Sequence, residues 1–302
     1  MSGRLLFASL DGQAIGTLHE NQNLWAFTYA KSWCDSAASF PLSPHLPLQN
    51  AALHDGASTR PVQWYFDNLL PEESVRALLA ADAGLPDIAD AFALLEHYGR
   101  ESAGSITLRA ADDSADVDCS LRLLGDAELD ARIRNLPAVP LTHSAPKKMS
   151  LAGAQHKLAV VLRDGQIFEP GGQALSTHIL KPNHPQPQDY PHSVVNEWFV
   201  MKLARRVGLD VPDIERRYVP APVYLIKRFD RELSEDGTVT RHHAIDGCQL
   251  LNLAATMKYS GWSLEALSEL VGHCRAPATA RLRMFRWLRA AVGRTLWSSR
   301  GR

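Results

Sequence analysis

Cysteine is scarce in this sequence, and the few cysteines present stand alone. Four occur in 302 residues, without a C-x-x-C pair or the dense spacing of a disulfide framework. This usage fits a reducing compartment, and we expect a cytoplasmic protein. The twelve histidines invite a metal site, but neighbours such as His242 and His243 rarely point at one ion. We therefore expect no metal site.

Long apolar runs and an excess of charge are also missing. No stretch of about 18 apolar residues occurs, so we expect no membrane-spanning helix. The first residues carry Arg4 and an apolar run broken by Ser9 and Asp11, which does not fit a signal peptide. With 32 Lys and Arg against 33 Asp and Glu, the whole chain is no polyanion binder. Contact with nucleic acid would need a local basic patch or a partner.

What is present is an ordinary globular composition in a chain long enough for two domains. Residues up to about 108 predict a small α+β unit. The strand candidates lie on both sides of the Asp11–Gly12 turn, within 24–33 and within 102–110. A turn followed by a helix is expected within 65–85, with Pro71 in the first turn and Gly84 at the end. A second helix is expected within 87–99.

The remaining two thirds of the chain predict three successive regions: a connector, a region rich in strands and a helical region. Residues 111–147 predict a connector with an acidic solvated loop and a short helix within 126–136. From Met149 to about Phe229 the pattern is rich in strands, including a hairpin around the glycine turn at 164–166. One clear helix there has Ser193 as its N-cap and Gly208 at its end. After Gly247 the pattern becomes helical.

Three features in this second half suggest phosphate chemistry. A loop of small residues leads to Lys157, Lys181 stands late in a strand, and Glu197 stands on the following helix. At about 100° per residue, Glu197 falls opposite the basic side of that helix. An inward carboxylate needs a cation, and Lys181 is the obvious one. A lysine fixed by a helix glutamate beneath a glycine-containing loop is how kinases hold nucleotide phosphates.

Each feature also has a plainer interpretation. Gly153 could only make a tight turn, Lys181 could be a surface lysine, and Glu197 could be favoured by the helix dipole. The strand that ends in LIKRF adds to the kinase interpretation, because a two-lobed kinase places its adenine-contacting hinge after such a strand. The next residues, Asp230 and Arg231, predict a surface ion-pair turn.

These stretches carry a specific resemblance, in order, over nearly the whole chain. The sequence resembles the HipA family of bacterial toxins, which are serine/threonine protein kinases of type II toxin–antitoxin modules. The matching stretches are YFDNLLPE (65–72), YGRESAGSITL (98–108), SLAGAQHKLA (150–159), THILKP (177–182), VVNEWFVMKLARRVGLDVP (194–212), LIKRFDR (225–231) and CQLLNLAATMKY (248–259). The resemblance implies an α+β fold: a protein-kinase-like N-terminal lobe with an extra small N-terminal subdomain and only the first helices of the helical C-lobe. The implied boundaries are 1–108 for the N-terminal subdomain, 109–147 for the connector, 148–245 for the nucleotide-binding lobe and 246–302 for the start of the C-lobe.

The resemblance also implies ligands, partners and roles for individual residues. ATP would be bound, with Mg²⁺ in the family, and Ser150 would be the autophosphorylation site whose phosphate ejects the loop. Glu197 would position the lysine. The implied nucleotide-binding residues are Ala152, Gly153, Ala154, Gln155, His156, Lys157, Lys181, Lys227, Arg228 and Phe229. Family substrates are aminoacyl-tRNA synthetases, glutamyl-tRNA synthetase among them. The partner would be a HipB-like helix-turn-helix antitoxin, which binds operator DNA, and no membrane is involved.

The sequence departs from the family pattern after MFRWLRAAVG (284–293). The family continues with a catalytic loop D-G-H-x-K-N, whose Asp is the base and whose Asn binds metal, and with a further metal-binding Asp. No D-x-H-x-K-N stretch occurs here, and eight arginines but no acidic residue follow Glu269. We expect a frameshift or early stop, so that no catalytic or metal-binding residue is assigned and phosphoryl transfer is lost.

That departure has one further consequence, and two alternative interpretations remain open. An apolar stripe at helical spacing would lose its covering helices and be partly exposed, at Leu282, Phe285, Leu288, Val292 and Leu296. Alternatively, the arginine-rich helix could bind nucleic acid or membrane. The rival interpretation is a non-catalytic interaction protein that docks the antitoxin through residues 1–108 and modulates operator binding.

Overall fold

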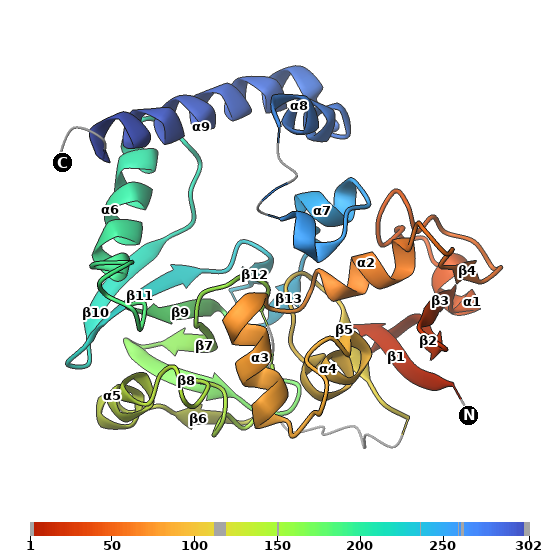
Figure 1. Ribbon diagram of the computed structural model, residues 1–302, viewed down its shortest axis with the longest axis horizontal. Coiled ribbons are helices and arrows are strands. Elements are labelled where there is room, and N and C mark those ends of the chain that lie inside the picture. Colours follow the sequence, from red (N-terminus) through yellow and green to blue (C-terminus); the bar gives the residue numbers. More distant parts are fainter. Residues whose placement is uncertain are drawn as a thin grey trace.

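The computed structural model describes most of the chain. The described residues are 3–111, 119–149, 151–235, 237–258, 260 and 263–298, the last ten of these by their backbone only. The acidic loop expected at 111–118 and Ser150 therefore lie outside the described residues, apart from position 111. The fold is mixed α/β, with two antiparallel sheets and flanking helices (Figure 1).

The first sheet belongs to the N-terminal part and has the strand order β4-β3-β2-β1-β5. Its strands are β1 (Arg4–Leu10), β2 (Gln13–Asn21), β3 (Leu24–Tyr29), β4 (Leu53–His54) and β5 (Thr107–Arg109). Asp11 and Gly12 both have positive φ, as the tight turn between β1 and β2 requires, so the predicted hairpin is confirmed. Strand β5 pairs with β1 and brings residues far along the chain back to the start.

Four helices cover this sheet and build its core. They are α1 (Lys31–Cys34), α2 (Pro61–Asp67), α3 (Glu73–Asp82) and α4 (Ala91–Tyr98). Gly84, with φ +66°, lies just past the end of α3 as predicted. The expected turn before this helix occurs at residues 68–69, but Tyr65 and Phe66, at the start of the predicted stretch, are buried in α2, which begins at Pro61. Pro71 is not in the first turn of α3 but lies between α2 and α3.

The second sheet has the order β10-β11-β9-β7-β8-β6 and lies beside the first. Its strands are β6 (Leu121–Leu123), β7 (Leu158–Arg163), β8 (Gln166–Pro170), β9 (His178–Pro182), β10 (Ile214–Tyr218) and β11 (Pro222–Lys227). The hairpin β7–β8 turns at Asp164–Gly165, as predicted. Strand β6 and helix α5 (Asp126–Arg134) come from the expected connector, and β6 extends this sheet at its β8 edge.

Helix α6 (Ser193–Arg206) packs across β9, β10 and β11. Ser193 is its first helical residue and not its N-cap, which corrects the sequence prediction. The N-cap is His192, in the left-handed conformation, and the backbone N–H of Val194 donates to Oδ1 of Asn183 at 3.0 Å. The Ser193 hydroxyl instead accepts from the backbone N–H of His184. The end of β9 therefore supplies the capping oxygen.

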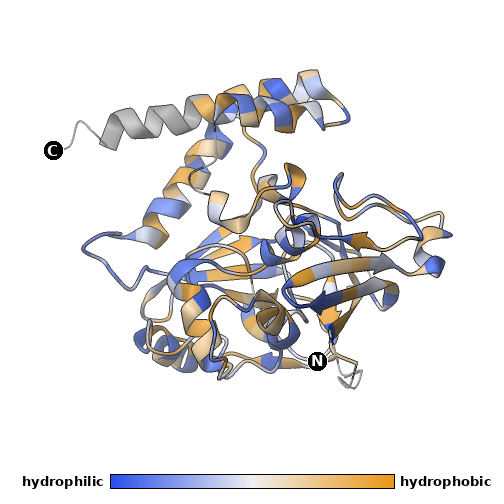
Figure 2. Ribbon diagram, turned by 45° about the vertical axis from the view of Figure 1, so that its right-hand side comes forward, coloured by the Kyte–Doolittle hydropathy of each residue, from blue (hydrophilic) through white to orange (hydrophobic). Residues whose placement is uncertain are grey.

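The C-terminal part is a short ribbon followed by helices. These elements are β12 (Arg231–Leu233), β13 (Val239–Arg241), α7 (Gly247–Leu250), the 3₁₀ helix η1 (Ala255–Met257), α8 (Leu264–Gly272) and α9 (Pro277–Ser298). Helix α9 crosses above α6 and stands clear of the two sheets (Figure 2). Leu282 and Phe285 are exposed on it, as predicted. The side chains of Val292 and Leu296 lie outside the described residues.

Candidate functional site

Lys181 and Glu197 meet on the α6 side of the second sheet. The Lys181 ammonium lies 3.0 and 3.2 Å from the two carboxylate oxygens of Glu197. The predicted pairing is confirmed. The two side chains are 23% and 30% exposed, so the pair is accessible to a ligand from solvent.

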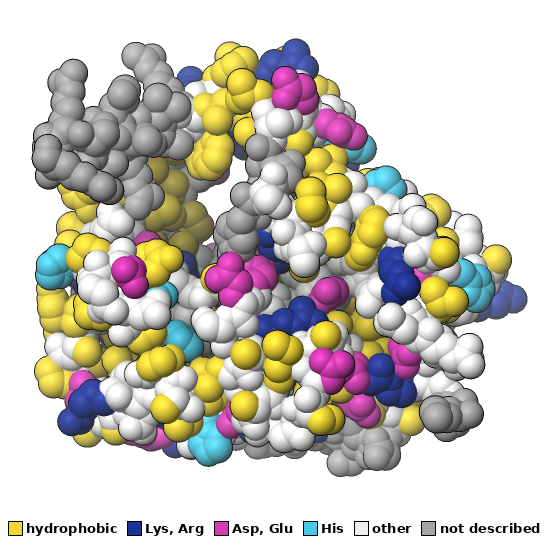
Figure 3. Space-filling model, viewed as in Figure 1, with side chains coloured by type: hydrophobic (Ala, Val, Ile, Leu, Met, Phe, Trp, Pro, Cys, Tyr) yellow, Lys and Arg dark blue, Asp and Glu magenta, His cyan; other side chains and the backbone are white. Residues whose placement is uncertain are grey.

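The strand register extends this pair into a row of polar side chains. Leu158 of β7 pairs with Leu180 of β9, so Lys157, one residue earlier, lies beside Lys181. Tyr224 of β11 pairs with Lys181 on the other side. Residues opposite one another on paired strands share a sheet face. The row therefore runs across three strands and faces α6. In Figure 3 the molecule is hollowed between α6 and α7, on this side of the sheet.

The loop of small residues closes around Lys157. The Lys157 ammonium folds back and donates to the carbonyl oxygen of Ala152. Gly153 has φ +113°, a conformation that other residues rarely adopt. A Cβ at Gly153 would lie 2.5 Å from the Lys157 nitrogen. Gly153 is thus explained by its φ, which disfavours any side chain, and the Lys157 ammonium would have to shift to make room for a Cβ there.

The electrostatics of this row favour an anion. Burial and the neighbouring Lys181 ammonium lower the pKa of Lys157 to about 8. Two cations thus share one side of the sheet. The Tyr224 hydroxyl is buried and has no hydrogen-bond partner among the described residues. Burial and the nearby Glu197 raise the pKa of Tyr224. The two ammonium groups are the charged donors that this row offers to an anion.

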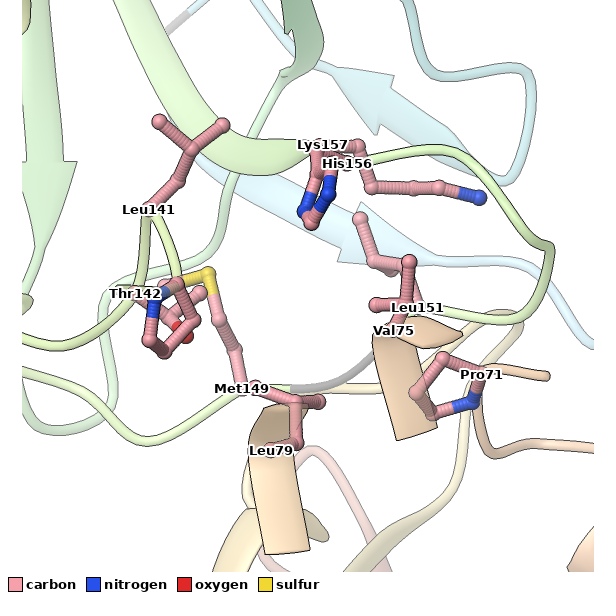
Figure 4. Close-up of a pocket in the computed structure, with 10 residues that line it drawn as sticks. Pro71, Val75, Leu79, Leu141, Thr142, Met149, Leu151, His156 and Lys157 are labelled. Carbon is pink, nitrogen blue, oxygen red and sulfur yellow. The ribbon is translucent and has the colours of Figure 1, made fainter. Parts of the chain in front are cut away.

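His156 turns the opposite way. Figure 4 shows its ring pointing into a small pocket, while the amine of Lys157 points away from it. That pocket holds about 20 Å³, room for no more than a water molecule, and burial lowers the pKa of His156. Met149 and Leu151, which flank the loop, are buried beside it. The structure thus places His156 in the packing beneath the loop, away from the row of lysines.

The hinge residues lie at the other end of the central strands. Lys227 pairs with His178, three residues before Lys181. Lys227 and Phe229 are exposed and line a groove of about 550 Å³ with residues 210–213. Neither Lys181 nor the loop lines that groove. The structure thus brings Lys157, Lys181 and Glu197 together, and sets the hinge apart from them.

Arg228 occupies a buried cluster of charges that the sequence analysis missed. Its guanidinium donates to Asp230 at 2.6 and 2.9 Å and to Glu101 at 3.1 Å. Arg231 also donates to Glu101, so the predicted surface turn at 230–231 is wrong. The reason is a carboxylate 130 residues earlier in the chain, to which Arg231 turns inward. Among the predicted hinge residues, only Arg228 commits its side chain to this cluster.

Glu101 is the centre of that cluster and comes from the N-terminal part. Its carboxylate is fully buried and accepts from Lys147 at 2.9 Å and from the Ser176 hydroxyl at 2.8 Å, besides the two arginines. Burial opposes its charge, but the surrounding cations hold the pKa of Glu101 well below its usual range. Its only signal in the sequence was its place in the stretch YGRESAG.

Two further expectations concern residues or groups outside this row. Ser150, the implied autophosphorylation site, lies outside the described residues. Within the described part of the chain, no group of three or more His, Cys, Asp or Glu side chains could hold a metal ion. In that same part, no helix has the length and apolar character needed to cross a membrane.

The fold and the row of lysines define a kinase-like protein, and comparison with known proteins agrees. The family described as "HipA N-terminal domain" matches residues 6–109, and the one described as "HipA-like C-terminal domain" matches residues 149–292. "Putative kinase Y4mE" of Sinorhizobium fredii is 34% identical over 94% of this chain and 69% of that protein. The chain belongs to the HipA family of kinase-like toxins.

Two further relatives come from Shewanella oneidensis. "Serine/threonine-protein kinase toxin HipA" is 29% identical over 87% of this chain and 61% of that protein. A solved complex of HipA, HipB and operator DNA matches with a TM-score of 0.77 and 28% identity, over 94% of this chain and 68% of that chain. The chain thus spans 61% to 69% of the length of these relatives.

Proposed function

We propose that the chain binds ATP on the α6 side of the second sheet, with its phosphates at Lys157 and Lys181. The observation that carries this proposal is the Lys181–Glu197 pair beside a second ammonium group whose pKa is lowered. Two adjacent cations repel each other, and a polyphosphate relieves that repulsion. Glu197 keeps Lys181 in place without neutralising Lys157.

The remaining predicted nucleotide contacts complete this proposal. The backbone of Ala152, Gly153, Ala154 and Gln155 would line the phosphates, because small residues let main-chain N–H groups approach an anion. The hinge would contact adenine through Lys227, Phe229 and the backbone of Arg228, since the Arg228 side chain is committed to the buried cluster. Bound Mg²⁺ would neutralise phosphate charge, and the described residues contain no group of three or more His, Cys, Asp or Glu side chains that could hold it.

Family membership supports the wider proposal. The activity would be ATP-dependent phosphorylation of a protein serine or threonine, with aminoacyl-tRNA synthetases as substrates and Ser150 as the autophosphorylation site. A HipB-like helix-turn-helix antitoxin would be the partner in the cytoplasm and would connect the chain to operator DNA. The complex formed by the Shewanella oneidensis HipA is the support for that partner.

We further propose that these 302 residues by themselves bind nucleotide without transferring phosphate. They contain no D-x-H-x-K-N stretch to supply a catalytic base and a metal-binding Asn. Without those groups, phosphoryl transfer loses much of its positioning and charge stabilisation. Robust Lys181-dependent transfer from labelled ATP by the isolated chain would overturn this part.

Titration with a fluorescent ATP analogue tests the binding proposal. Lys181→Ala removes one charge-assisted contact and should weaken binding about 10- to 150-fold, the equivalent of roughly 1.5–3 kcal/mol. Lys202→Ala, on the exposed side of α6, is the control and should leave affinity unchanged. The proposal fails if the chain binds no ATP or if the two variants behave alike.

The rival proposal, a non-catalytic protein that binds the antitoxin through residues 1–108, keeps one specific support. The relative of known structure is a toxin bound to HipB and DNA. A pull-down with a neighbouring helix-turn-helix protein, together with no ATP binding, would favour it. Antitoxin binding together with ATP binding would favour the first proposal.

A further inference from the structure

The segment from Tyr65 to Glu72 lies between the small-residue loop of the proposed nucleotide site and the stretch from Gln249 to Lys258, which are far apart in the sequence. On one side, Pro71 forms an isolated parallel β-bridge with Gly153 of the small-residue loop. On the other, the segment binds residues of α7 and of the chain that follows it. This is why Pro71 stands outside α3: its backbone pairs with the loop.

The contacts on the second side are direct and involve both backbone and side chains. The Lys258 ammonium lies 2.8 Å from Oε1 of Glu72 and 3.0 Å from the carbonyl oxygen of Asn68. The Asn68 side chain donates to the carbonyl oxygen of Leu253 at 2.9 Å, and Gln249 donates to that of Tyr65 at 2.8 Å. Hydrogen bonds thus join two stretches that lie almost 190 residues apart, YFDNLLPE and CQLLNLAATMKY.

The charges of this contact act on the loop. Burial opposes the charge of Lys258, but Asp246 and Glu72 together raise its pKa. The Glu72 carboxylate also attracts the ammonium of Lys157, which the loop encloses. Glu72 therefore stands at the point where Lys258, Lys157 and the Pro71–Gly153 bridge come together.

We propose that Glu72 is a positioning residue of the nucleotide site, which holds the small-residue loop in its phosphate-binding conformation through Lys258 and the Pro71–Gly153 bridge. This inference rests on the proposed ATP binding at Lys157 and Lys181. The N-terminal part then forms one wall of the site. Because the contact lies at the loop and not at the hinge, it supports binding of the phosphates and has little effect on binding of the nucleoside.

The test compares Glu72→Gln with Glu20→Gln in the full chain. Glu20 is a matched control, because its side chain is 11% exposed against 10% for Glu72, and each carboxylate meets a cation at 2.8 Å. Glu20 pairs with Arg4 in the first sheet. Affinities for ATP and for adenosine are measured by calorimetry, and amide exchange is measured over residues 151–157.

The expected result is a difference between ligands and between variants. Glu72→Gln weakens ATP binding about tenfold, as loss of one charged contact would, and adenosine binding less than about twofold. It also speeds amide exchange in the loop about tenfold, whereas Glu20→Gln changes none of these. A purely structural role for Glu72 would weaken ATP and adenosine binding together.

Three outcomes overturn the inference: parallel losses for ATP and adenosine, equal effects of the two variants, or loop exchange that does not change. Absence of ATP binding by the unaltered chain is a separate result, which defeats the proposed function. In that case the exchange measurement alone decides whether Glu72 holds the loop.

Discussion

Two of the clusters in which lysine or arginine meets glutamate differ in how open they are. The carboxylate of Glu101 is fully buried and is bound by cations that are themselves buried. The pair of Lys181 and Glu197 is about a quarter exposed and has a second lysine beside it. The first cluster joins the N-terminal part to the second sheet, and the second leaves positive charge for a ligand.

We infer that the same pairing serves stability in one place and, under the proposed function, nucleotide binding in the other. Burial decides which of the two roles a pair has. A buried ion pair has lost its hydration, so removing one partner strongly destabilises the fold. A partly exposed pair keeps its hydration, and breaking it changes stability little. Three substitutions or conditions separate the two roles.

The largest effect is expected for Glu101→Gln. Removing this charge leaves the ammonium of Lys147 buried without its carboxylate, and it leaves Asp230 as the remaining carboxylate partner of Arg228 among the described residues. The free energy of unfolding should fall by about 3–5 kcal/mol. Urea unfolding of the variant and of the unaltered chain measures the difference. A loss no larger than that of Glu197→Gln would erase the distinction between the clusters.

The next effect is a pH dependence that belongs to the lysine row alone. Lys157 has its pKa lowered to about 8, and a bound phosphate raises it again, so ATP binding takes up a proton above about pH 8. Affinity for ATP should then fall about fivefold as the pH rises from 8 to 9, and about tenfold per pH unit just above that. Titrations at several pH values measure it. Adenosine binding by the unaltered chain and ATP binding by the Lys157→Met variant should not depend on pH in this way. An ATP affinity that stays constant over this pH range would contradict a phosphate contact at Lys157.

The smallest effect is expected for Glu197→Gln. Because the pair with Lys181 is partly exposed, the free energy of unfolding should fall by about 0.2–1 kcal/mol. ATP affinity should fall by less than in Lys181→Ala, since the lysine keeps its charge and loses only its fixed position. Unfolding and binding are measured on the same samples. A stability loss above that of Glu101→Gln would reverse the comparison.

The sequence predicted the local part of this arrangement. Helical spacing placed Glu197 opposite the basic side of α6, and Lys181 was the nearest cation in the preceding strand. Both of the hairpin turns that the sequence predicted followed from Asp-Gly pairs. Such features depend on residues within about one helix or hairpin of each other, where spacing along the chain determines spacing in the fold.

The sequence did not predict contacts between distant segments. Asp230 and Arg231 look like an exposed charged turn because nothing nearby reveals that Glu101 will be buried beside them. Lys258 meets Glu72 across 186 positions, and no periodicity encodes such a pairing. The N-cap of α6 was wrong for the same reason, since the capping oxygen belongs to Asn183, outside the helix.

The way the loop encloses Lys157 has a chemical consequence. An amine with a pKa of about 8 is unprotonated in a sizeable fraction of molecules near neutral pH, and an unprotonated amine is a nucleophile. An acetyl group on Lys157 would remove its positive charge, so its hydrogen bond to the carbonyl oxygen of Ala152 would no longer be charge-assisted.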